Sequence, residues 1–151
     1  MRKRTLAREA ALQILYAQEM NPQELPELFE LWWTEHSDTD SEIREFAEEI
    51  VSGTCHYLKD LDLAIEKAAV NWDLHRMAIL DKLILRLATY ELLFRHDIPP
   101  KVTINEAVNL AKKFSQEESG KFVNGVIDKI SHSENVRFGD LHVPKSSLQM
   151  D

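Results

Sequence analysis

Apolar side chains recur from the start of the chain at the three- and four-residue spacing of an amphipathic helix. Over residues 5–19 this stripe consists of Leu6, Ala7, Ala10, Ala11, Ile14 and Leu15. Arg4 and Arg8 are four residues apart, so we expect them to share a helix face that points away from the stripe. Asn21 and Pro22 then end the predicted helix.

The next part of the chain predicts two more helices separated by a polar loop. The first is short and is marked by Leu25, Leu28, Phe29, Trp32 and Trp33. After the loop at 35–40, a longer helix spans 43–58 and either continues or bends near Lys59-Asp60. Thr39 and Glu42 have the spacing of a capping box, which satisfies the first free amides of a helix.

Residues 77–95 are dense in Leu and Ile and contain neither Gly nor Pro. This composition predicts a largely buried central helix. We expect its polar face to consist of Asp81, Lys82, Arg86 and Glu91. The segment Ile98-Pro99-Pro100 then forms a rigid break.

Two further capping boxes, Thr103-x-x-Glu106 and Ser115-x-x-Glu118, predict the starts of the last two helices. The final helix buries Phe122, Val123, Val126, Ile127 and Ile130. Gly125 within it costs roughly 1 kcal/mol relative to Ala, which indicates close approach of another helix or a ligand. Periodicity fades from Ser131 onward.

About seven helices, no strand pattern and no internal repeat predict the all-α class. The chain holds only 4 Gly and 5 Pro in 151 residues, which is little turn material for a many-stranded sheet. We expect one compact helical domain over residues 1–130, built from two helical subbundles. A loosely ordered tail is expected over residues 131–151.

Charge is distributed unevenly over a chain whose net charge is −8. Residues 1–8 contain four bases and no acid, whereas residues 20–50 contain many acids and one base, Arg44. The basic start either attracts phosphate or is a solvated helix end, and charge alone leaves both interpretations open. The single cysteine, Cys55, and the absence of an apolar signal segment or membrane span favour the cytoplasm.

Catalytic and metal-binding patterns are missing from the sequence. Its six histidines form no two-His metal spacing on one helix, and no glycine-rich phosphate loop or nucleophile elbow occurs. Cys55 and His56 are helix neighbours about 100° apart, so a buried structural thiol is the better interpretation than a dyad. We therefore predict a non-enzyme without catalytic residues, cofactor or metal. Asp73 is a plausible helix cap, and Trp72 is expected to pack beneath it.

Four stretches together resemble the NusB family of transcription antitermination factors. They are Ala7-Arg8-Glu9-Ala10-Ala11-Leu12-Gln13-Ile14-Leu15-Tyr16, Asp81-Lys82-Leu83-Ile84-Leu85-Arg86-Leu87-Ala88-Thr89-Tyr90-Glu91-Leu92, the run from Ile98 to Lys112, and Lys121-Phe122-Val123-Asn124-Gly125-Val126-Ile127-Asp128. The resemblance implies two three-helix subbundles set across one another. It also implies binding of boxA RNA together with NusE, on ribosomal RNA operons, in a complex with RNA polymerase, NusA and NusG. Some members of the family self-associate, so a homodimer is also possible.

The resemblance places RNA contacts at two positions. The arginine-rich start of the family corresponds here to Arg2, Lys3, Arg4 and Arg8, although Thr5 and Leu6 stand where further bases often occur. The start of the last helix contributes Glu118, Lys121, Phe122 and Asn124. Phe122 either stacks on a base or belongs to the core. The exposed side of the central helix is the candidate surface for NusE, with Asp81 and Lys82 at its rim.

Two other functions compete with this interpretation. A helical protein-interaction scaffold without RNA contact agrees with the acidic surface but leaves the basic start unexplained. A NusB-like domain also precedes the catalytic domain of some ribosomal RNA cytosine methyltransferases. Those enzymes need a further domain and nucleophilic cysteines, and this chain has one cysteine and about twenty residues after its last predicted helix.

Overall fold

A computed structural model describes residues 2–133 of the chain, and over that range it contains only helices, turns and loops. The elements are α1 (Arg2–Met20), α2 (Leu25–Glu35), α3 (Ser41–His56), α4 (Leu58–Ala68), the short 3₁₀ helix η1 (Leu74–Arg76), α5 (Ile79–Phe94), α6 (Pro100–Phe114) and α7 (Ser119–Ser131). The all-α prediction is confirmed. Most of the tail predicted over 131–151 lies outside the described residues.

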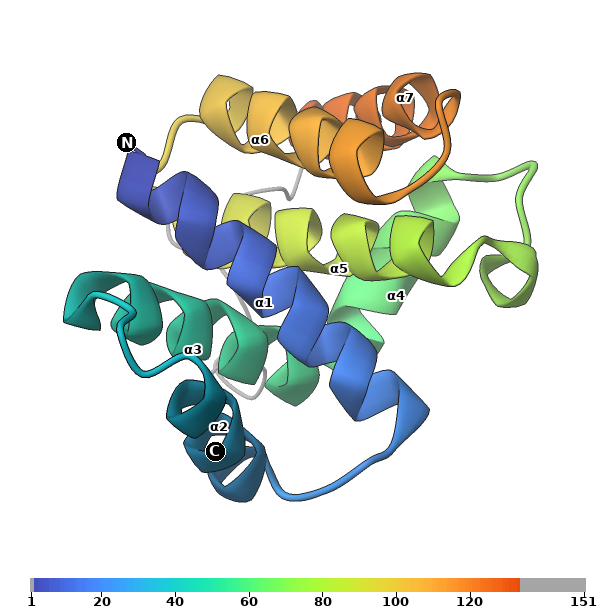
Figure 1. Ribbon diagram of the computed structural model, residues 1–151. Helices are drawn as coiled ribbons and strands as arrows, with labels where there is room; N and C mark the ends of the chain where they lie inside the picture. The colour runs from blue at the N-terminus through green and yellow to red at the C-terminus, as the bar shows by residue number, and fades with distance from the viewer. Residues whose placement is uncertain (1, 134–151) are drawn as a thin grey trace, which may run out of the picture.

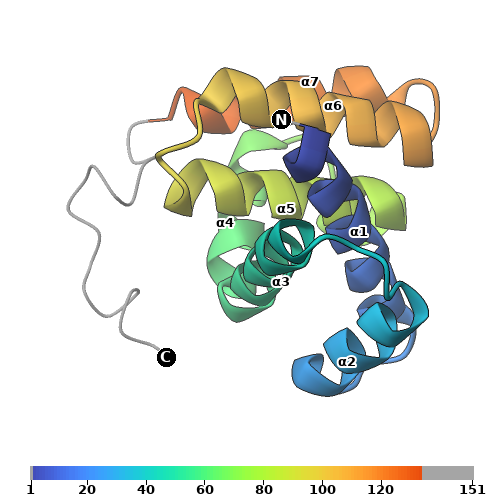
Figure 2. The same cartoon turned by 60° about the vertical axis from the view of Figure 1, so that its left-hand side comes forward.

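Helix α5 occupies the middle of the molecule and packs against α1, α3, α4, α6 and α7 (Figure 1). Helix α1 crosses in front of α5 and lies along α3, while α6 and α7 run side by side over the opposite part of α5 (Figure 2). The first three helices and the last three therefore form two groups, as the two-subbundle prediction requires. Helix α4 joins α5 and α7 from behind.

Burial of α5 extends further than its sequence pattern indicates. Every residue from Leu83 to Leu93 is buried, because helices cover this segment on all sides. The predicted polar face is wrong for Arg86 and Glu91, which are 9% and 2% exposed. The Arg86 guanidinium donates to both carboxylate oxygens of Asp62, at 2.8 and 2.9 Å, which compensates for the loss of water.

The helix starts predicted from capping boxes are wrong. Helix α3 is capped by Asp40, whose carboxylate accepts from the Glu42 amide at 2.7 Å, and not by Thr39. Helix α6 begins at Pro100, since proline has a helical φ and lacks the amide that a first turn leaves unsatisfied. Thr103 consequently lies inside α6, where its hydroxyl is available to another helix.

Two glycines show where helices approach closely. Gly125 is exposed, and a Cβ built on it would meet no heavy atom within 4 Å outside its own stretch of helix, so the predicted close approach of another helix at this position is wrong. The close approach occurs instead at Gly53 of α3, where an added Cβ would lie 2.1 Å from Cε1 of Tyr90. The Tyr90 hydroxyl donates to Glu49 at 3.2 Å, which helps to hold the ring over the glycine.

No helix within residues 2–133 combines the length and hydropathy needed to cross a lipid bilayer.

Replacing Gly53 by Ala is expected to lower the free energy of unfolding by about 1–3 kcal/mol, because the Tyr90 ring must shift to admit a methyl group. Gly125→Ala is the matched control, and it should be neutral or stabilising by up to about 1 kcal/mol, since the added methyl group meets nothing. Urea unfolding monitored by circular dichroism measures both. Equal stability of Gly53→Ala and the wild type would contradict the close packing of α3 on Tyr90.

Candidate nucleic-acid interface

The first turn of α1 carries three exposed cations, Arg2, Lys3 and Arg4, which we call the basic arm. Lys3 Nζ lies 2.6 Å from Glu42 and 3.2 Å from Asp40, at the start of α3. These two carboxylates raise the pKa of the Lys3 ammonium, and the Glu42 amide together with Lys3 lowers the pKa of Asp40.

Arg4 in the same arm packs its guanidinium over Phe46 of α3, with 4.6 Å between the guanidinium carbon and the ring centroid. The arm is therefore positioned by α3, and one of its charges is partly neutralised there.

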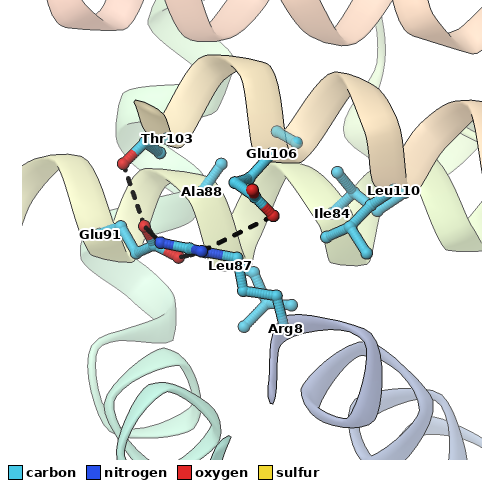
Figure 3. A pocket seen from close by; sticks show the side chains of 9 residues that line it. Arg8, Ile84, Leu87, Ala88, Glu91, Thr103, Glu106 and Leu110 are labelled. Atoms are coloured by element: carbon cyan, nitrogen blue, oxygen red, sulfur yellow. Dashed lines mark hydrogen bonds and ion pairs between the residues drawn. The ribbon is translucent and has the colours of Figure 1, made fainter. Parts of the chain in front are cut away.

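Arg8 lies one turn beyond the arm and shares a helix face with Arg4, since both guanidinium groups lie over the Phe46 ring. The prediction that this face points away from the core is wrong at Arg8. Its side chain is 5% exposed and is enclosed by α5 and α6 (Figure 3). Nε donates to Glu91 at 2.6 Å and Nη2 donates to the other oxygen of the same carboxylate at 2.9 Å. Nη1 lies 3.6 Å from Glu106 of α6.

The carboxylates around Arg8 have further donors. Thr103 donates its hydroxyl to Glu91 at 3.0 Å, and Thr5 donates to Glu106 at 3.0 Å. The space beside this cluster is about 10 Å³, which holds one water molecule at most. A guanidinium so enclosed has no access to a phosphate, and Arg8 instead fixes α1 to α5 and α6.

The start of α7 presents Glu118, Lys121 and Asn124 to solvent. Phe122 is half-buried, packs against the core, and lies edge-on to Trp72, with 4.9 Å between the ring centroids. Trp72 is 60% exposed, so the prediction that it packs beneath Asp73 is wrong. Asp73 does cap η1, by accepting from the His75 amide at 2.9 Å.

Asp81, predicted at the rim of a partner surface, is engaged within the molecule. Its carboxylate accepts from the hydroxyls of Ser115 at 2.7 Å and Ser119 at 3.1 Å, and so ties the α6–α7 connection to α5. Ser115 is thus committed to Asp81, and α7 begins at Ser119 rather than at the predicted capping box. Lys82 is half-buried beside it. Because α5 is covered from Leu83 onward, the predicted exposed side of the central helix is wrong.

The basic arm and the start of α7 lie toward opposite ends of α6. The arm is beside the beginning of α6, whereas α7 starts beyond its end (Figure 1). Helix α6 has 15 residues and is therefore about 22 Å long. The two sets of predicted contact residues do not form one compact patch. They mark the two ends of a surface that runs along α6.

Comparison with known proteins assigns the chain to a family. A profile of the NusB family matches residues 5–132, which is most of the chain. The chain belongs to the NusB family. It is 47% identical over 134 residues to the transcription antitermination protein NusB of Desulfitobacterium hafniense, covering 87% of this chain and 90% of that protein. The NusB protein of Geobacter sulfurreducens is 46% identical over 131 residues, covering 87% and 95%.

Solved structures of NusB proteins have the same fold. The NusB chain of a crystal structure of NusB and NusE in complex with double-stranded RNA superposes with a TM-score of 0.78 at 30% identity, covering 87% of this chain and 97% of that one. T. maritima NusB gives a TM-score of 0.75 at 34% identity, covering 99% of this chain and 98% of that one. The family resemblance predicted from the sequence is thereby confirmed.

Replacing Arg8 by Ala is expected to lower the free energy of unfolding by about 3–5 kcal/mol, because the Glu91 carboxylate would remain buried without its cation. Arg8→Met combined with Glu91→Leu removes both charges and should recover a large part of that loss. Urea unfolding of Arg8→Met, Glu91→Leu and the double variant gives the coupling between the two positions. Arg2→Ala, on the exposed arm, is the control. If Arg8→Ala lowers the free energy of unfolding no more than Arg2→Ala does, Arg8 does not anchor α1 to α5 and α6.

Proposed function

We propose that this protein is an RNA-binding transcription antitermination factor that acts together with NusE. The observation that carries the proposal is the basic arm on an acidic helical body that belongs to the NusB family. Its relatives are named transcription antitermination proteins, and a NusB structure with the same fold is in complex with NusE and RNA. The protein acts by binding rather than by catalysis. Its proposed RNA target is boxA of nascent RNA from ribosomal RNA operons.

The charge distribution supports local rather than indiscriminate RNA binding. A net charge of −8 repels nucleic acid from most of the surface, while the exposed arm attracts phosphate at one end. Lys121 and Asn124 provide a cation and an amide at the other end of α6. We propose that RNA contacts the three cations of the basic arm together with Lys121 and Asn124. Glu118 lies at the margin of this site.

We propose that Phe122 shapes the surface of the RNA site, because its ring is half-buried and packs edge-on against Trp72. Arg8 contributes by holding the arm in place.

For the protein partner, we propose that NusE docks near the first turn of α5, where Lys82 reaches the surface. Asp81 supports this region from inside by holding Ser115 and Ser119. The resulting complex is proposed to join RNA polymerase with NusA and NusG. Self-association that covers the RNA face would be a form that competes with RNA.

An RNA mobility shift with and without NusE tests the proposal. The probe is a single-stranded leader RNA containing boxA, and the control is a scrambled RNA of equal length. We expect a shifted complex that NusE strengthens. NusE binding with no RNA in the complex would favour the protein-interaction scaffold instead.

Neutralising the arm with Arg2→Gln and Arg4→Gln should weaken binding of the boxA and scrambled RNAs alike, because contacts to phosphate carry no sequence information. The slope of log affinity against log salt should become shallower by about 1.4, at about 0.7 per phosphate of a single strand. Lys59→Gln with Lys67→Gln, two exposed cations of α4, is the charge-matched control and should leave the slope unchanged. Fluorescence anisotropy across a salt series measures both, and equal slopes would exclude the arm as a phosphate site.

Removing the carboxylates that hold Lys3, by Asp40→Asn with Glu42→Gln, should tighten RNA binding at low salt, because Lys3 becomes available to phosphate. The salt slope should steepen by up to about 0.7. The same change in a Lys3→Gln background should leave that slope unaltered. An equal gain in RNA affinity in the wild-type and Lys3→Gln backgrounds would show that the carboxylates act only by repelling phosphate.

A further inference from the structure

The outer face of α6 forms a ridge between the two ends of the proposed site. Lys101, Asn105, Asn109 and Lys112 are all exposed on it. Their spacing of four, four and three residues places them on one side of the helix. We call these four residues the α6 ridge.

The carboxylate of α6 is turned away from this ridge. Glu106 is the single acidic residue of α6, and it points toward α1, where it accepts from Thr5 and lies near Arg8. Lys113 also faces α1, where its Nζ forms an ion pair with Oε1 of Glu9 at 3.0 Å. Within residues 2–133, neither Lys101 nor Lys112 forms an ion pair, so the charge of the α6 ridge is not neutralised by the described part of the chain.

The α6 ridge lies near both ends of the site. Thr5 of α1 is hydrogen-bonded to Glu106, which brings the first turn of α1 beside the first half of α6. At the other end, a Cβ on Gly120 would lie 3.4 Å from both Cγ and Cε of Lys112. The Lys112 stem therefore lies across the first turn of α7, one residue before Lys121.

We infer that the α6 ridge is a phosphate track that carries single-stranded RNA from the basic arm to the start of α7. The inference rests on the proposed function and adds a site that joins its two ends. Lysine ammonium groups bind phosphate as point charges, and the amides of Asn105 and Asn109 donate to and accept from sugar hydroxyls or base edges. An open helix face does not enclose a base, but it can support the sugar-phosphate backbone of an RNA strand over the length of α6, about 22 Å.

The double variant Lys101→Gln, Lys112→Gln tests the track in the presence of NusE. With single-stranded boxA RNA as probe, the salt slope should become shallower by about 1.4 relative to wild type. Lys59→Gln with Lys67→Gln again provides the control of equal charge, and it should keep the wild-type slope. Circular dichroism should show unchanged folding, because both ridge lysines are exposed.

A series of progressively shorter RNAs locates the contacts. Lys112→Gln alone should weaken binding of the full-length probe but not of a probe too short to extend beyond the arm. If Lys112→Gln lowers the affinity equally for probes of every length, the track is overturned.

The outcomes separate this inference from the proposed function. A ridge variant that behaves like its α4 control, while Arg2→Gln with Arg4→Gln still weakens RNA binding, would overturn the track and leave the proposed function in place. A ridge variant that loses NusE binding when no RNA is present would identify a protein interface and also overturn the track. A wild-type protein that binds no RNA even with NusE would overturn both.

Discussion

The buried ion pair between Arg8 and Glu91 fixes the N-terminal helix to the central helix α5. Both side chains are almost completely removed from water, so their charges depend on each other and on the hydroxyl of Thr103. An apolar contact would tolerate rotation or sliding of α1, whereas two directed bonds to one carboxylate fix its position along α5 and its rotation. Because Glu106 and Thr5 extend the cluster to α6, the same interaction places the first turn of α1 beside the beginning of α6.

The helices themselves could be predicted from the sequence because burial imposes a periodicity that a single segment displays. The positions of α1, α2 and α5, and the all-α class, follow from such stripes. Helix starts could not be predicted from capping boxes, since the hydroxyls of Thr103 and Ser115 bond to residues on α5. The spacing within one segment contains no information about these partners.

The same limit explains the errors at the candidate site. Arg4 and Arg8 have equivalent positions on α1, but α5 and α6 enclose the side chain of Arg8 and leave that of Arg4 exposed. One arginine is therefore exposed and the other is an anchor. Gly53 and Gly125 are likewise both helical glycines, and only the placement of Tyr90 distinguishes the packed one from the open one. The family resemblance places RNA contacts on both arginines, and it could not distinguish the exposed side chain of Arg4 from the buried one of Arg8.

Electrostatics then constrains how the proposed RNA site works. Of the three cations on the arm, Lys3 is already paired with Asp40 and Glu42, and the whole chain carries a net charge of −8. Two remaining arginines give few phosphate contacts, and such contacts weaken steeply as salt rises. On the proposed function, useful affinity at cellular salt therefore requires either more contacts along the strand or a second binding partner. The unneutralised lysines of α6 would meet the first requirement and NusE the second. Both act over a surface whose geometry is set by the anchor at Arg8.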